Sequence, residues 1–316
     1  MMMTRPLLRQ PSALASIGLW LIGAVALAYL SLQILSAWRG GLFVEAARAI
    51  PGQTIALAAL VYMTGHLFRS MRLALLIGGW NVGLRLIASF HFVTAGVSLA
   101  MPLKLGEFFR IAALSRVAGS ITRAIEIVWW ERLLDVVALI IIMMIALRDV
   151  TGSQWQDFSG IVAVSIAFVA VSVLAFFVLP DNLRRTSVLI IRRYRGAHTV
   201  PVLKALERAR CAIIEAPRMV RTKMGSLAAL TVLIWTCEIG TFAIILRAMG
   251  QVTASAPDAL LKLLSFLARG QTLADALQNH RLLDVGFLPY LAATQVPLTF
   301  VAVPAAILFT LYWRRR

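Results

Sequence analysis

Ionisable residues gather in a stretch that otherwise has membrane-like hydrophobicity, from Ser98 to Ile142. A charge near bilayer depth is costly, so it persists mainly where it is paired or lines a polar cavity. The alternative is that these are interfacial charges that snorkel to water. We expect pairing in this stretch, first between Glu107 and Arg110 and between Arg132 and Asp135, each at i, i+3. The ionisable residues are Lys104, Glu107, Arg110, Arg116, Arg123, Glu126, Glu131, Arg132 and Asp135.

The first part of this stretch has the residue types of a turn that binds an anion. Pro102 removes a backbone donor and ends a helix, and Gly106 lets the turn close. Glu107 then lies at the start of the next helix, where a carboxylate suits the positive end of the helix dipole. Arg110 lies on the same face and can bind a phosphate with two hydrogen bonds, and Lys104 adds a point charge.

Acidic residues on the following helix can balance these cations. Glu131 and Asp135 are i, i+4 neighbours. If their helix lies against the turn, they compensate Arg110 and Lys104 when no ligand is bound. The pattern predicts a charged cleft for an anionic head group, lined also by Gly106, Glu107 and Arg132 with Pro102 as the structural turn. It predicts no metal and no cofactor.

Two further places are secondary candidates for this cleft. His66, Arg69 and Arg72 follow at i, i+3 and i+6 on one helical face. Cytoplasmic anchoring by two arginines is the alternative explanation for them. Trp235 and Glu238 stand in a later apolar run. The four histidines are scattered along the sequence and form no ligand pattern.

The composition predicts a polytopic membrane protein with an all-α transmembrane bundle. Of the 316 residues, 60% are hydrophobic and 14% are charged, against about 45–50% and about 25% in soluble domains. The net charge of +17 is explained by basic residues in short loops and tails, as in the positive-inside rule, so no nucleic acid is expected as a partner. Cys211 and Cys237 form no CxxC motif, and no P-loop occurs, which excludes an ATP-driven pump. We expect one integral membrane domain over residues 1–316.

Hydropathy predicts about six full spans. The first is too long for a cleaved signal peptide, and Pro289, Pro297 and Pro304 are expected to interrupt the last. The basic segment 181–225 is predicted to be a cytoplasmic loop, with both termini on the same side. The predicted spans are residues 12–36, 53–77, 119–147, 160–180, 226–249 and 286–312.

This topology requires residues 86–118 to begin and end on the cytoplasmic side. We therefore predict a re-entrant helical hairpin there, with its turn at 101–106 and with the charged motif region extending over 86–135. Non-helical backbone at membrane depth is tolerated where protein buries it or water reaches it. A peripheral or interfacial helix pair is the alternative, and a second hairpin at 258–285 is left open.

These motifs resemble the lysylphosphatidylglycerol synthase transmembrane-region family, also called the flippase-like domain family. The resemblance is carried by P-x-K-x-G-E-x-x-R (102–110), by E-R-L-L-D (131–135) and by the W-x-x-E of Trp235 and Glu238. It implies a multi-pass protein of the bacterial inner membrane that moves or handles lipids between leaflets. Family members usually have Arg at the position of Lys104 and often a Pro/Gly-rich element near the last spans, which is absent from 269–290.

We therefore expect a flippase-like transporter for an anionic phospholipid or a lipid-linked intermediate, more a transporter than an enzyme. One alternative is a membrane transferase that uses a lipid-linked substrate. Another is a non-catalytic partner of an envelope-synthesis enzyme, with 181–225 as a docking surface for a cytoplasmic protein. No soluble aminoacyl-transfer segment follows the last span, so we do not expect the activity of the full synthase.

Overall fold

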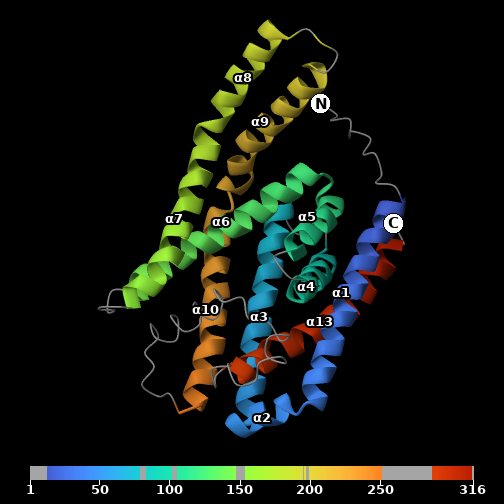
Figure 1. Ribbon diagram of the computed structural model, residues 1–316, viewed down its shortest axis with the longest axis vertical. Helices are drawn as coiled ribbons and strands as arrows, with labels where there is room; N and C mark the ends of the chain where they lie inside the picture. The colour runs from blue at the N-terminus through green and yellow to red at the C-terminus, as the bar shows by residue number, and fades with distance from the viewer. Residues whose placement is uncertain are drawn as a thin grey trace.

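The computed structural model describes residues 13–78, 83–101, 105–146, 154–194, 196, 199–250 and 287–314, and this part of the chain contains helices and no strands (Figure 1). The predicted all-α polytopic bundle is confirmed. The helices are α1 (Ala13–Arg39), α2 (Leu42–Ala49), α3 (Gly52–Ile77), α4 (Leu84–Ala100), α5 (Leu105–Ala118), α6 (Ile121–Ala146), α7 (Gln154–Phe177), α8 (Leu179–Arg193), α9 (Thr199–Arg221), α10 (Met224–Ala248) and α13 (Phe287–Arg314).

Apart from α9, which has 23 residues but belongs to the basic segment, six of these helices are long enough to cross a bilayer. Four of them, α1, α7, α10 and α13, combine sufficient length with high hydropathy and few charges. The other two, α3 and α6, have 26 residues each, or about 39 Å at 1.5 Å per residue, against a hydrocarbon core of about 30 Å. Their mean hydropathy is lower, or their number of charged residues higher, than in the other four. They hold most of the ionisable residues considered below. The protein is a multi-pass membrane protein.

The interior of the bundle is built around α3 and α4. Helix α3 packs most extensively against α10, and α4 packs against α13, α3, α1 and α5. A Cβ atom added at Gly65 of α3 would lie 3.1 Å from the Cβ of Cys237 on α10. The absence of a side chain at Gly65 therefore lets α3 and α10 approach closely, as small residues do in membrane helix pairs.

Helices α4 and α5 form the predicted helical hairpin. Their backbones meet at Gly106, where an added Cβ would lie 2.4 Å from the Cα of Ser98, so only glycine fits. The helices have 17 and 14 residues, or about 26 and 21 Å, which is shorter than the bilayer core. Residues 102–104, with Pro102 and Lys104, lie outside the described residues. The re-entrant placement of the hairpin stays a prediction.

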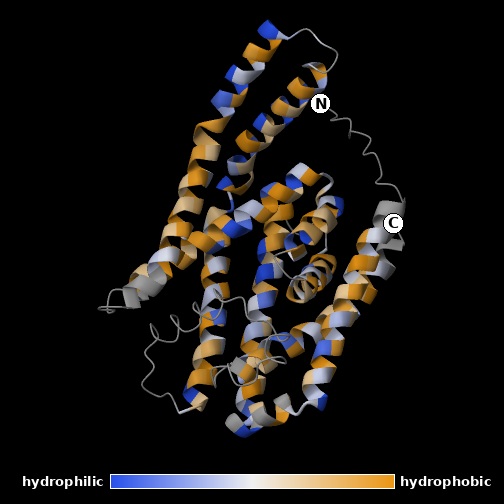
Figure 2. Cartoon of the chain, viewed as in Figure 1, coloured by the Kyte–Doolittle hydropathy of each residue, from blue (hydrophilic) through white to orange (hydrophobic). Residues whose placement is uncertain are grey.

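In its described part, the basic segment 181–225 is helical, and its cytoplasmic location stays a prediction. Helix α7 passes through a turn at Val178 directly into α8, and α9 returns alongside α8 to α10. The α8–α9 hairpin extends beyond the other helices (Figure 1) and is much more hydrophilic than α7 (Figure 2). Pro180 does not oppose this arrangement because it lies in the first turn of α8, where no backbone donor is needed.

The structure differs from the sequence-based expectation at two further places, after α1 and within α13. The connection after α1 contains the short helix α2. Helix α13 runs without interruption through Pro297 and Pro304, although both were expected to break it. Helix α13 packs against α3 and α4, although Pro304 itself is exposed, and prolines are tolerated in membrane helices where the freed backbone groups find other partners. Residues 258–285, the possible second hairpin, lie outside the described part.

Candidate functional site

Four pairs of arginine and carboxylate side chains connect α3, α5, α6 and α10 within the bundle. Each pair joins two different helices, so it depends on helix packing and not on local spacing. The pairs are Arg69–Glu238, Arg72–Asp135, Arg110–Glu131 and Arg132–Glu107. We call these eight residues the charged cluster.

Arg72 is the deeply buried cation of the charged cluster. It is 2% exposed, and its Nη1 and Nη2 donate to the two carboxylate oxygens of Asp135 at 2.6 and 3.1 Å. Its Nη1 also donates to Thr231 Oγ1 at 3.1 Å. A bidentate pair of this kind is strong and fixes orientation, so Arg72 ties α3 to both α6 and α10.

The pairs on α5 differ from the expected ones. Glu107 and Arg110 were expected to pair with each other, but both side chains turn to α6. Arg110 Nη2 donates to Glu131 Oε2 at 2.6 Å, which is the compensation expected from Glu131, and Glu107 accepts from Arg132. Because α5 lies against α6, an inter-helix partner is available to each. The expected pair between Arg132 and Asp135 is present at 3.9 Å.

The secondary candidates join the same region from α3 and α10. Arg69 donates to Glu238, so the pair links helices that are 169 residues apart in sequence. Trp235 lies one turn before Glu238, and its buried Nε1 has no hydrogen-bond partner in the described part of the chain. The sequence indicated both arginines but not which acids they contact.

Two histidines that seemed scattered in the sequence meet beside this network. His66 and His91 are 4% and 3% exposed, and His66 Nδ1 lies 3.0 Å from His91 Nε2. Arg69 Nη1 lies 3.4 Å from His66 Nε2, and the ring of Tyr62 packs edge-on against His66. A signal was present in the sequence, since His91 is an ionisable residue in the middle of the apolar helix α4.

The charged cluster has equal numbers of cations and anions. Desolvating such pairs is costly unless their geometry is good, and removing one partner leaves a buried charge uncompensated. Among the described residues, no group of three or more His, Cys, Asp or Glu side chains could hold a metal ion. The arrangement favours binding of an oxyanion, which can take the place of a carboxylate beside an arginine.

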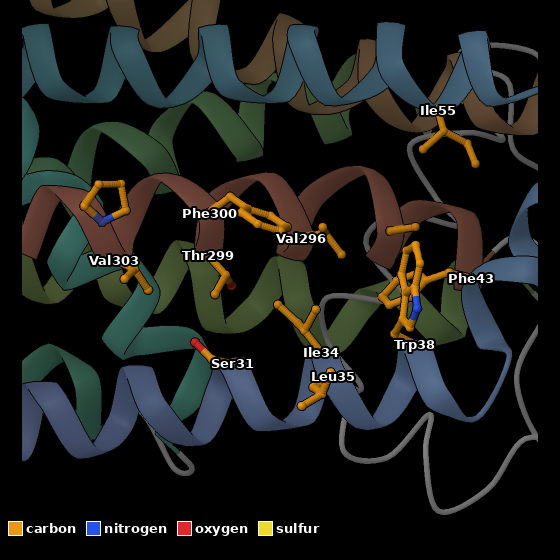
Figure 3. Close-up of a pocket in the computed structure, with 12 residues that line it drawn as sticks. Ser31, Ile34, Leu35, Trp38, Phe43, Ile55, Val296, Thr299, Phe300 and Val303 are labelled. Carbon is orange, nitrogen blue, oxygen red and sulfur yellow. The ribbon is translucent and has the colours of Figure 1, made fainter.

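An apolar groove of about 690 Å³ lies between α1, α2, α3 and α13 (Figure 3). Its lining includes Leu35, Trp38, Phe43, Val296 and Phe300. Trp38 and Phe300 remain 70% and 72% exposed. The charged cluster contributes none of the described residues that line this groove.

A second cavity of about 400 Å³ lies where α9 meets α6 and α7. Trp129 and Trp130 line it, and both have a hydrogen-bond partner: Trp129 Nε1 donates to Ser172 Oγ and Trp130 Nε1 donates to the carbonyl of Ala216, each at 3.0 Å. Both rings also contact Phe176. Their contacts are those of packing residues.

Comparison with known protein families identifies one that covers most of the chain. The family described as "Lysylphosphatidylglycerol synthase TM region" matches residues 17–270, a range that includes the whole charged cluster and both buried histidines. No curated protein and no solved structure matches the chain significantly.

Proposed function

The chain belongs to the lysylphosphatidylglycerol synthase TM-region family, and from this premise we propose that it is a flippase-like lipid transporter. Its substrate would be an anionic phospholipid or a lipid-linked intermediate. The observation that carries the proposal is the set of four arginine–carboxylate pairs inside the bundle. Ionisable residues at membrane depth typically mark the path of a substrate.

In this proposal, the head group enters by exchanging partners with the arginines. The phosphate of the lipid replaces Glu131 beside Arg110, since guanidinium binds both groups in the same bidentate manner. The displaced Glu131 and the neighbouring Asp135 balance the charge and take up protons. Gly106, Glu107 and Arg132 line the same route.

The apolar groove offers a separate place for an acyl chain. Ile55 of the groove and Arg69 of the charged cluster are 14 residues apart on α3, or roughly 21 Å along the helix axis. A phospholipid needs both a polar site and an apolar surface, and this separation is within the thickness of a bilayer. The groove and the charged cluster would therefore receive different parts of the lipid.

We also propose that the protein lies in the bacterial inner membrane with both termini and the α8–α9 hairpin in the cytoplasm. Segment 181–225, which contains this hairpin, carries ten cationic residues in its described part against three acidic ones, and such segments are retained on the cytoplasmic side. The cations are Arg184, Arg185, Arg192, Arg193, Lys204, Arg208, Arg210, Arg218, Arg221 and Lys223, and the acids are Asp181, Glu207 and Glu215.

Mass spectrometry of the lipids that co-purify with the full chain tests the function. We expect the wild type to retain one anionic lipid or lipid-linked sugar above its share of the membrane, and Arg110→Ala to lose that enrichment. Arg210→Ala is the matched control because Arg210 pairs with exposed Glu207 on α9. In liposomes with a labelled phosphatidylglycerol, Arg110→Ala should also slow exchange between leaflets.

If the wild type and Arg110→Ala both retain only the bulk lipid mixture, the transporter proposal fails. The α8–α9 hairpin would then carry the second candidate function, a docking surface for an acidic cytoplasmic protein. The observation that favours it is that α8 contains no buried residue, and that its cations and the apolar side chains of Val188, Leu189 and Ile191 are exposed.

A further inference from the structure

The hydrogen bonds of the two buried histidines determine where their protons lie. Arginine has no acceptor, so the contact of Arg69 Nη1 with His66 Nε2, at 3.4 Å, requires Nε2 to be the acceptor. A neutral His66 then carries its proton on Nδ1 and donates it to His91 Nε2, at 3.0 Å. His91 Nε2 is thus an acceptor, and a neutral His91 carries its own proton on Nδ1.

The Nδ1–H group of His91 has no acceptor among the described residues. His91 is 3% exposed, and its Nδ1 is buried without a hydrogen-bond partner in the described part of the chain. A buried N–H left without a partner costs roughly its full desolvation penalty. Such an atom in a native interior therefore calls for an acceptor that the described residues do not supply.

Two arginines on the helices that pack against α4 also have a buried N–H donor without a partner. Arg72 Nε and Arg110 Nε are buried without partners among the described residues, although the outer nitrogens of both side chains bind Asp135 and Glu131. Before a ligand binds, those two carboxylates, one turn apart on α6, hold the guanidinium groups as neighbours. Helix α4, which carries His91, packs against both α3, which carries Arg72, and α5, which carries Arg110.

We propose that His91 Nδ1, Arg72 Nε and Arg110 Nε form an oxyanion subsite that binds the phosphate diester of an anionic lipid. The subsite rests on the proposed function and adds His91 to it. It presents N–H donors from α3, α4 and α5, and so selects a ligand group that only accepts hydrogen bonds. His66 is a positioning residue, because its donated proton forces His91 to keep its own proton on the side of the subsite.

Binding of dioctanoyl-phosphatidylglycerol to the full chain in detergent tests the subsite by titration calorimetry. We expect His91→Phe, which keeps a ring but removes the donor, to bind at least about tenfold more weakly, or about 1.4 kcal/mol. His91→Asn should bind close to wild type because its amide nitrogen occupies the place of Nδ1. The control is Thr241→Val, which alters a buried hydroxyl of α10 that already donates to Cys237 O.

The histidine tautomers provide a readout that a purely structural role would not change. In protein labelled with ¹⁵N-histidine, NMR should show the proton of His91 on Nδ1 in the wild type. In His66→Leu the proton should move to Nε2, since nothing then donates to that nitrogen. A wild-type His91 protonated on Nε2 would refute the assignment of donors.

The outcomes separate the subsite from the transporter proposal. If the wild type binds the lipid and His91→Phe binds it equally well, the subsite is wrong while the transporter proposal stands. If the wild type does not bind the lipid, the subsite is wrong, and the transporter proposal is decided separately by the lipids that co-purify with the chain. Titration with inorganic phosphate alone identifies the source of the oxyanion: strong binding that depends on His91 would refute a lipid ligand, and weak or absent binding supports it.

Discussion

Arg72 shows that a buried charge can be retained although its desolvation costs free energy. It is 2% exposed, and it remains charged because Asp135 and Thr231 accept hydrogen bonds from its outer nitrogens. The attraction offsets the loss of hydration only while both partners are present. The contribution of Arg72 to stability therefore depends on the presence of Asp135.

We predict that Arg72→Ala and Asp135→Ala each destabilise the protein by about 3–5 kcal/mol, because each leaves one buried charge unpaired. The double variant Arg72→Met, Asp135→Leu should be destabilised by less than the sum of the two single-variant effects. Thermal unfolding of the purified protein in detergent measures these effects. As a control, Arg210→Ala breaks the exposed pair with Glu207 and should change stability by about 0–1 kcal/mol. Strictly additive single effects would contradict the buried pair.

At the scale of elements, the α4–α5 hairpin brings the charged cluster together. Glu107 and Arg110 stand on α5, and they reach Arg132 and Glu131 only because α5 folds back beside α4 and lies against α6. The position of Gly106 against Ser98 sets how closely α5 approaches α4. Packing at this glycine thus controls the geometry of the site.

Gly106→Ala tests this packing. The added Cβ would meet the Ser98 backbone at 2.4 Å, so the helices must move apart, at an expected cost of about 1–3 kcal/mol. Gly160→Ala in α7 is the matched control, since an added Cβ there meets nothing within 4 Å. Melting temperatures in detergent compare the two variants. Equal melting temperatures would show that α4 and α5 are not in close contact at Gly106.

The whole molecule has two unlike parts, an apolar bundle and a basic helical hairpin that extends from it (Figure 2). Cys211 lies exposed on α9 of that hairpin, and Cys237 is half-buried in α10. These are the only two cysteines of the chain. They allow the orientation in the membrane to be measured without engineered labels.

We predict that a membrane-impermeant maleimide labels Cys211 in inverted membrane vesicles and not in intact cells, because the basic hairpin stays in the cytoplasm. Labelling is read as a mass increase of the purified protein. Cys211→Ser should abolish it, since Cys237 is shielded within the bundle. Labelling of Cys211 in intact cells would reverse the proposed topology and, with it, the side on which Arg69 and Arg72 lie.

The sequence by itself determined the fold class and the family. Hydropathy and helix-breaking residues act locally, so the predicted span 53–77 agrees with α3, Gly52–Ile77, and the hairpin at 86–118 agrees with α4 and α5. Local signals also had limits. The basic segment 181–225 is helical because α8 and α9 pack against each other, and composition alone does not show such a contact.

The tertiary structure decided which charges are partners. Spacing along one helix favoured a pair between Glu107 and Arg110, but both side chains found partners on α6. The contact between His66 and His91 is also non-local. Spacing reveals only neighbours on the same helix, whereas buried charges and donors are satisfied by whatever group another helix brings within about 3 Å. That choice depends on how the helices pack and rotate, which is a property of the assembled bundle.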